Sequence, residues 1–365
     1  MHRDAGAELI ARAKSGVLPL ITVQVPYASY IYDLVRNYSG RVPDEPLTYH
    51  PSQHDLARID ARYYNVTGEA EGSGLRYDLT LIPSIGFAER EWHPGTRTEW
   101  VTPDQAWGET HTQAKWTVVA NRNSYAAGTT TQLDWFAPAI RPAFNRAFAV
   151  QNSRWRNFMT INVQEWTPSG DVLEKGGYLP FGSVSDNLKL YQGDRLLYEN
   201  KFSASMQFKT VPAETLPYRL VVDASRPAGT WRLSTRTHTE WAFVSSTNDA
   251  SWFQPLALLQ MEYRMDTDLH GDVAAGRSEG IRIKPIPQAG GGPSTGNITS
   301  VTLEVSYDDG TTWEPVTLTR GADDWWGGAL KLATQPGGFV SVRATATTDA
   351  GFSIKQEIIR AYGLR

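Results

Sequence analysis

The chain has 365 residues, of which 41% are hydrophobic and 20% charged, so it can form a sizeable core and is long enough for two or three domains. It contains no cysteine, which excludes disulfides, thiolate metal sites and a cysteine nucleophile. A formal net charge of -4, without a cluster of lysine and arginine, argues against binding to nucleic acid.

The sequence also lacks membrane and export signals. No apolar run approaches the roughly 18 residues that cross a membrane, so we expect no membrane span. The first residues are charged and lack the apolar stretch and cleavage site of a signal peptide. We therefore expect either a cytoplasmic protein or an internal piece of a longer one.

The opening of the chain has a different pattern from the rest. Residues 4–14 have the spacing of a helix, and residues 17–25 form an apolar run of strand length. The apolar positions of a second helix, which begins at Pro26, would be Tyr27, Tyr30, Ile31, Leu34 and Val35. A strand that is apolar on both faces needs a sheet covered on two sides, which this chain does not supply nearby. Residues 1–52 are therefore predicted to be an α/β remnant, the tail of a module that begins upstream.

From about residue 57 the pattern has a period of two, as in β-strands. Apolar Leu75, Tyr77 and Leu79 alternate with polar neighbours, residues 231–244 alternate over a longer stretch, and residues 186–200 form a hairpin pattern around a Gly turn. The 13 Trp and 16 Tyr beside 31 Gly and 21 Pro also favour many short strands. We predict a mainly β fold of tandem β-sandwich domains, immunoglobulin- or fibronectin-like, preceded by the small α/β remnant.

The predicted domains follow the composition of the chain. A Pro/Gly-rich stretch is expected to be a linker. The predicted boundaries are 1–52 for the α/β remnant, 53–185 and 186–286 for two β-sandwich-like domains, 287–297 for the linker, and 298–365 for an immunoglobulin-like sandwich.

Carboxylates next to tryptophan recur along the chain, a pattern that carbohydrate-binding proteins and glycosidases share. The pairs are Glu91-Trp92, Glu99-Trp100, Asp134-Trp135, Glu165-Trp166, Glu240-Trp241 and Asp324-Trp325. Adjacent residues of a strand point to opposite faces, so the two members of a pair cannot act on one ligand. We therefore favour tryptophan in the core and carboxylate outside over a sugar site.

Catalytic and metal motifs are weak. No G-x-S-x-G elbow and no G-T-S-x-A stretch is present, so no serine has the context of a nucleophile. Asp266, Asp268, His270 and Asp272 alternate like the start of a calcium loop, but Arg277 stands where the loop needs glutamate, which favours a solvated turn. We predict no catalytic, cofactor-binding or metal-binding residue and no cofactor.

One motif is specific. The residues Ser306, Asp308, Gly310, Thr312 and Trp313 match the Asp box S-x-D-x-G-x-T-W. In this motif the aspartate accepts backbone N–H bonds across a hairpin turn, glycine takes positive φ and tryptophan packs beneath. Sialidases repeat the box, but this chain has one copy, so we predict a structural turn with Trp313 in the core of the last sandwich.

Several stretches taken together resemble a known family. VPYASYIYDLVRN (25–37), FAEREWHPGTRTEWV (87–101), LKLYQGDRLLYEN (188–200), WRLSTRTHTEWAF (231–243) and the last stretch from VSYDDGTTW to the end resemble the C-terminal region of large secreted subtilisin-like serine peptidases from actinobacteria. The resemblance implies an extracellular protein with a catalytic subtilisin domain upstream, often with a protease-associated domain whose tail residues 1–52 resemble. The family's catalytic Asp, His and Ser contexts match no position here.

Three functions follow as expectations. The first is a non-catalytic accessory region of such a peptidase, supporting folding, stability or substrate docking, with the upstream peptidase domain or its protein substrate as partner. The second is a carbohydrate- or cell-wall-binding protein, which would need exposed, coplanar tryptophans. The third is a glycosidase, which would need two carboxylates about 5 to 9 Å apart in one cleft.

Overall fold

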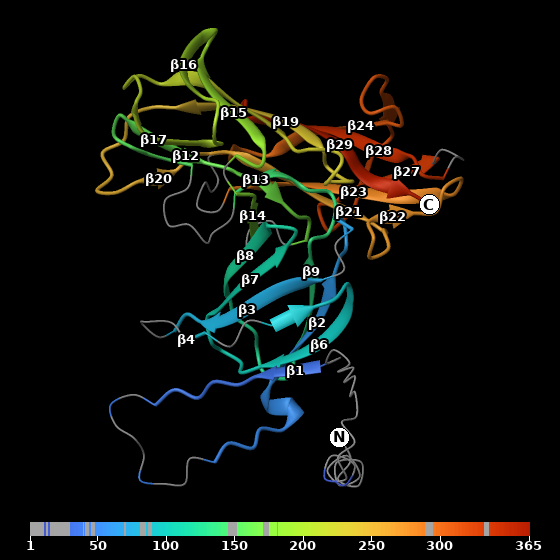
Figure 1. The fold of residues 1–365 in the computed structure, drawn as a ribbon. Coiled ribbons are helices and arrows are strands. Elements are labelled where there is room, and N and C mark those ends of the chain that lie inside the picture. Colours follow the sequence, from blue (N-terminus) through green and yellow to red (C-terminus); the bar gives the residue numbers. More distant parts are fainter. Residues whose placement is uncertain are drawn as a thin grey trace.

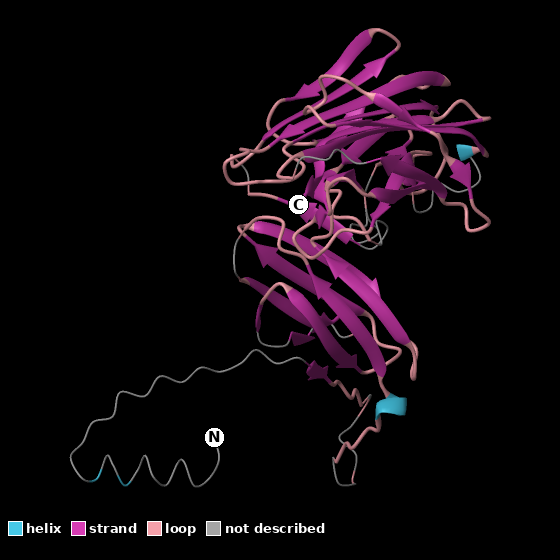
Figure 2. Ribbon diagram, turned by 90° about the vertical axis from the view of Figure 1, so that its right-hand side faces the viewer, coloured by secondary structure: helices cyan, strands magenta, loops and turns pink. Residues whose placement is uncertain are grey.

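The computed structural model describes residues 11, 14, 30–38, 40, 44, 48–68, 71–80, 85, 86, 90–144, 152–170, 175–180, 182–288, 295–331 and 336–365. The elements with defined bounds in these ranges are strands and one 3-10 turn, η1 (Gln53–Asp55). The strands form two β-sandwich units, one above the other in Figures 1 and 2. The prediction of a mainly β fold with tandem sandwiches is confirmed.

The first sandwich consists of two sheets that face each other across a common core. One sheet has the order β1-β6-β2-β9, with β1 (Tyr30–Asp33), β2 (Ala57–Tyr63), β6 (Gly95–Val101) and β9 (Thr130–Trp135). The other has the order β14-β8-β7-β3-β4, with β5 also paired to β3: β3 (Gly72–Asp78), β4 (Ile85–Gly86), β5 (Arg90–Trp92), β7 (Trp107–Gln113), β8 (Trp116–Asn123) and β14 (Lys175–Tyr178).

The second unit is built on a nine-stranded sheet of order β16-β15-β18-β19-β29-β28-β24-β25, with β22 beside β29. Its strands are β15 (Ser185–Gln192), β16 (Arg195–Asn200), β18 (Leu216–Ser225), β19 (Arg236–Ser245), β22 (Asp272–Val273), β24 (Ile298–Ser306), β25 (Glu314–Val316), β28 (Phe339–Thr348) and β29 (Ser353–Leu364). The predicted hairpin forms as β15 and β16, with Gly193 at φ 56° in its turn.

Two smaller sheets and the large one share a second hydrophobic core. One has the order β17-β12-β11-β20, with β11 (Ser153–Trp155), β12 (Phe158–Asn162), β17 (Ser205–Thr210) and β20 (Gln254–Pro255). The other has the order β21-β23-β27-β26, with β21 (Leu259–Met265), β23 (Ser278–Pro287), β26 (Thr319–Arg320) and β27 (Trp326–Lys331). A separate pair consists of β10 (Arg141–Ala143) and β13 (Gln164–Thr167).

The predicted α/β remnant is only partly described. Ala11 and Lys14 have helical backbone, whereas the rest of the first helix and the whole apolar run 17–25 lie outside the described residues. The second predicted helix is wrong at residues 30–33, which form β1, parallel to β6. The physical reason is a long-range one: the carboxylate of Asp33 is fully buried and paired with Arg76 and Arg90, and this contact outweighs the local helical spacing.

The predicted domain boundaries do not coincide with breaks between sheets. Strands β11 and β12 lie in the second unit, but β14, which follows them in sequence, returns to the first sandwich. Across the predicted linker 287–297, β19 pairs with β29 and β23 pairs with β27. Residues 186–286 and 298–365 therefore share two sheets and one core, because the chain crosses between them repeatedly.

A buried arginine joins the two units. Arg226 follows β18 in the second unit, and its guanidinium lies 4.4 Å from the ring centre of Trp231 and 4.5 Å from that of Trp166. Trp166, Trp231 and the neighbouring Leu233 belong to the core of the first sandwich. The connection between β18 and β19 is thus part of the first sandwich's core, and aromatic rings replace a counter-ion around the charge.

We predict that residues 298–365 do not fold alone. The isolated piece would expose the edge of β29 that pairs with β19 and would leave β27 without β23. A purified 298–365 fragment should give the narrow amide dispersion of an unfolded chain in its NMR spectrum, and adding a purified 1–288 fragment should restore dispersion. A well-dispersed spectrum of the fragment alone would show that the last six strands, β24 to β29, form a domain of their own.

Candidate functional site

The tryptophans of the carboxylate pairs lie mostly in the cores. Trp92, Trp135, Trp166, Trp241 and Trp325 are buried, which agrees with the core-packing interpretation. The pair Glu99-Trp100 is reversed: Glu99 is fully buried and Trp100 is partly exposed, with Tyr32 stacked 6.3 Å from it. The alternation of the strand holds, but a charged group occupies the core side.

The reversal belongs to an ion-pair network inside the first sandwich. Arg76 donates hydrogen bonds to Asp33, Glu99 and Glu109, all of which are fully buried. The predicted apolar face of β3 is therefore wrong, since Arg76 points inward while Leu75 is only half-buried. Burial opposes ionisation, but Arg76 and Arg97 lower the pKa of Glu99 to about 2, so it is a fixed carboxylate.

The imidazole rings of two histidines contact carboxylates. Burial lowers the pKa of His111, whose Nε2 lies 3.3 Å from Glu109 Oε2, and its Nδ1 is buried without a hydrogen-bond partner. His238 contacts Asp223 at 2.6 Å and Glu240 at 2.9 Å through its two ring nitrogens, and the Asp223 hydrogen bond raises its pKa. Neither imidazole is hydrogen-bonded to a serine, so neither has the geometry of a general base for one.

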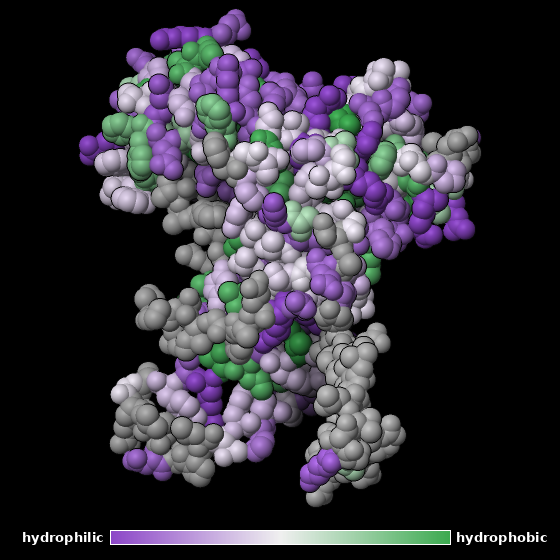
Figure 3. All heavy atoms as spheres, viewed as in Figure 1, coloured by the Kyte–Doolittle hydropathy of each residue, from purple (hydrophilic) through white to green (hydrophobic). Residues whose placement is uncertain are grey.

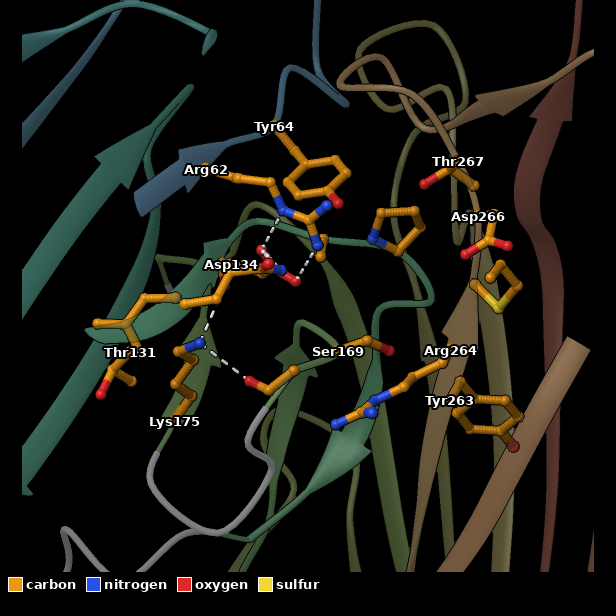
Figure 4. Close-up of a pocket in the computed structure, with 16 residues that line it drawn as sticks. Arg62, Tyr64, Thr131, Asp134, Ser169, Lys175, Tyr263, Arg264, Asp266 and Thr267 are labelled. Atoms are coloured by element: carbon orange, nitrogen blue, oxygen red, sulfur yellow. Dashed lines mark hydrogen bonds and ion pairs between the residues drawn. The ribbon is translucent and has the colours of Figure 1, made fainter. Parts of the chain in front are cut away.

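A groove of about 450 Å³ lies between the two units (Figure 4). Its first-sandwich wall carries Arg62, whose Nε and Nη2 each donate to an Asp134 oxygen at 2.6 Å. Lys175 Nζ donates to the backbone carbonyls of Asp134 and Gly170, both at 2.9 Å. These cations are thus held in place by the protein itself.

The opposite wall comes from β21 and the residues after it. Tyr263, Arg264 and Asp266 line this side, and Arg264 is exposed with its guanidinium 4.4 Å from the Trp325 ring centre. Burial raises the pKa of Tyr64, on the first wall, to about 12, so its hydroxyl stays protonated at neutral pH. Ser169, which also lines the groove, donates to the Ala139 carbonyl at 2.9 Å. The groove therefore contains charged side chains of both signs, which suits the binding of a ligand that carries charged groups.

A pair of carboxyl groups has the raised pKa values that glycosidase acids share. Burial, and then the charge of Glu165, raises the pKa of Asp186 to about 7, and burial also raises the pKa of Glu165. Glu165 already accepts the Ala204 amide at 3.0 Å, and neither carboxyl lines the groove between the units. The raised values follow from burial of the carboxyl groups.

The predicted calcium-like loop is held by protein contacts. Asp268 Oδ1 accepts the backbone amides of His270 and Asp272 at 2.9 and 3.1 Å, as in an Asx turn. Asp272 is paired with Arg232 at 2.6 Å. Within the described residues, no group of three or more carboxylates and histidines is arranged to hold a metal ion.

The Asp box has the hydrogen bonds that its sequence predicts. Asp308 Oδ1 accepts the Thr312 amide at 2.9 Å, Oδ2 accepts the Thr312 hydroxyl at 2.6 Å, and Ser306 Oγ accepts the Gly310 amide at 2.9 Å. Gly310 has φ 85°. Trp313 differs from the prediction: it is half-buried, outside the core, with the Arg343 guanidinium 4.4 Å from its ring centre.

Comparisons with known proteins give only distant similarities. No family model and no curated protein sequence matches the chain. Solved structures similar to it include the Clostridium thermocellum CbhA fibronectin(III)-like modules, at 12% identity over 61% of this chain and 94% of that one, TM-score 0.20. Others are three N-terminal domains of the bacteriophage RB49 Highly Immunogenic Outer Capsid protein, at 8% identity over 81% and 88%, TM-score 0.21, and Dscam1 isoform 6.44, at 9% identity over 86% and 73%, TM-score 0.17.

No helix among the described residues has the length and apolar character to span a membrane. Sequence patterns did not identify the groove, because one wall comes from residues between 62 and 175 and the other from residues 263–267, and only the fold brings them together.

We predict that Asp308→Ala lowers the melting temperature of the full chain at pH 7 and has little effect near pH 2. Hydrogen bonds from Thr312 and Ser306 lower the pKa of Asp308 from 3.8 to about 2. The carboxylate therefore stabilises the fold above pH 3.8, and this contribution is lost as the pH falls through about 2. Thr317→Ala, an exposed threonine outside the turn, is the control. Equal melting of Asp308→Ala and wild type at pH 7 would contradict the structural role.

We predict the opposite pH dependence for Asp186→Asn. Because burial raises the pKa of Asp186 from 3.8 to about 7, ionisation destabilises the folded state, and this cost appears as the pH rises through that range. The substitution should stabilise the chain at pH 8 by about 3 kcal/mol, at 1.36 kcal/mol per pKa unit less some screening by solvent, and change little at pH 3. Urea unfolding at both pH values measures this change in the free energy of unfolding, with the exposed Asp194→Asn as control.

Proposed function

We propose that this chain is a non-catalytic accessory region of an extracellular subtilisin-like serine peptidase, where it supports folding and docks protein substrate. The resemblance of its sequence to such regions motivates the proposal. The observation that carries it is the enclosed junction of the two units: Arg226, which follows β18 of the second unit, is enclosed by Trp116, Trp166 and Trp231 of the first sandwich's core. A scaffold whose parts cannot rotate freely can hold a substrate in a fixed direction relative to a neighbouring domain.

A second buried arginine supports the same conclusion. Arg141 donates to the Met261 carbonyl in the second unit at 3.1 Å and to the Pro168 carbonyl at 2.6 Å. Its side chain is fully buried, and Glu262 lies 3.4 Å away. Breaking such a buried set would leave carbonyls and a charge without partners, so the junction resists bending.

The alternatives receive less support from the geometry. Carbohydrate binding calls for exposed, coplanar tryptophans, and five of the six tryptophans beside carboxylates are buried. A glycosidase needs two carboxylates that face one cleft, whereas Glu99 and Glu109 are held by Arg76 inside the first sandwich. These two carboxylates stabilise the fold through their ion pairs with Arg76.

We predict that the coding sequence upstream of Met1 continues in frame through a subtilisin-type domain. Deleting residues 30–365 from that longer protein should reduce the yield of active peptidase several-fold, because loss of stabilising contacts lowers abundance, while kcat/KM on a short chromogenic peptide stays the same. A fluorophosphonate probe should label the upstream domain and leave this chain unlabelled. Stoichiometric labelling of a serine in this chain, or an upstream frame without a peptidase domain, would overturn the proposal.

A further inference from the structure

Five aromatic rings gather at one end of the second unit, on and beside the sheet that contains β11, β12 and β17. This aromatic face consists of Trp155, Phe158, Phe208, Trp252 and Phe253. Phe253 lies at its centre, with the rings of Trp155, Phe208 and Trp252 at 5.7 to 5.8 Å. Phe158, Phe208 and Trp252 are 39%, 60% and 63% exposed. Figure 3 shows hydrophobic side chains on this end of the unit.

The backbone is strained where it presents Phe208. This residue has φ 50°, a region that bulky side chains avoid, and its amide donates to Thr160 Oγ1 at 3.3 Å where the register of β12 and β17 shifts. Gln207 and Phe208 are consequently both exposed, which breaks the alternation of the strand. Strain of this kind is unfavourable, and here it places a phenyl ring in solvent.

The polar groups around the rings already have hydrogen-bond partners within the protein. Trp155 Nε1 donates to the Ala250 carbonyl at 2.9 Å, and Asn248 Oδ1 accepts the Arg156 and Ala250 amides. Gln254 Nε2 donates to the Trp252 carbonyl at 3.2 Å. A saccharide needs hydrogen bonds to its hydroxyls beside a flat ring, whereas the rings of Trp252 and Phe253 meet at 85°. The face therefore suits an apolar side chain better than a sugar.

The surroundings favour a polypeptide over a lipid surface. The Arg156 guanidinium lies 5.3 Å from the Trp155 ring centre, and the exposed Asp249 lies in the same loop as Trp252, so the rim has both signs of charge. An anionic membrane would repel the acidic part of this rim. In the described part of the chain, β17 is the outer strand of its sheet, and an extended segment can pair with such an edge.

We propose that the aromatic face binds an extended polypeptide segment through its bulky apolar side chains, while the segment's backbone lies along β17. This inference rests on the proposed function, since it assigns the substrate docking to one surface. An apolar side chain of the bound segment lies against Phe253 and between Phe208 and Trp252, and loses its contact with water there.

The test uses the full chain and two fluorescein-labelled peptides, GSLFLSG and GSASASG, with binding followed by anisotropy. The apolar peptide should bind, and the polar one should not. Trp252→Ala and Phe208→Gly should each weaken binding by about ten-fold, as for residues at the centre of an interface. The melting temperature of Phe208→Gly should not fall, because glycine adopts positive φ without strain. Tyr30→Ala, which removes a ring that is 61% exposed on β1, is the matched control.

Other outcomes overturn the inference. Equal binding of both peptides, or loss of binding with Tyr30→Ala alone, would place the docking elsewhere. Cosedimentation with vesicles of phosphatidylcholine and phosphatidylglycerol, without peptide binding, would make the face a membrane contact. A marked fall in melting temperature for Phe208→Gly would make the ring structural. The assay needs no peptidase, so its failure leaves the accessory role standing, and failure of the upstream reading frame leaves the peptide result standing.

Discussion

The buried guanidinium of Arg76 is the constraint on which the first sandwich depends. A charge of this kind costs several kcal/mol to bury unless partners surround it, and here the partners come from both sheets: Asp33 from β1, Glu99 from β6 and Glu109 from β7. Because these contacts require fixed positions on three strands, they set the register of β6 and β7 and attach β1 to the sheet edge. The interior of this sandwich is therefore specified by charge pairing as much as by apolar volume.

The same constraint explains where sequence reasoning succeeded and where it failed. The alternation of β19 gives the correct buried face, with Thr237, Trp241 and Phe243 inside, because apolar or small side chains occupy that face. For β3 the alternation correctly predicts a strand but the wrong face, since Arg76 is inside. The helix predicted at residues 30–33 is wrong for the same reason. Partners 23 to 57 residues away in the sequence decide these positions, and the local periodicity carries no information about them.

The Asp box was predictable in detail because its contacts are local. Ser306, Asp308 and Thr312 lie within seven residues of each other, so the spacing alone determines the turn. The depth of Trp313 was not predictable, because Arg343 from β28 covers the ring. The groove, the junction at Arg226 and the aromatic face are all formed by distant segments. Turn residues and strand periodicity predict the individual strands and turns that form these three features. Which of those strands and turns come into contact depends on the strand order of the sheets.

The junction and the far end of the second unit differ in how far the protein covers their unfavourable groups. At the junction, Arg226 is enclosed by Trp166 and Trp231, and Arg141 donates to the Met261 carbonyl in the second unit. At the far end of the second unit, Phe208 keeps an unfavourable φ while its ring remains in water, so folding gains little from that ring. A backbone that maintains such a residue needs support from the rest of the fold, and the nine-stranded sheet behind β17 supplies it. An apolar partner that covers the Phe208 ring would offset the backbone strain, because apolar area of the ring would then be removed from water.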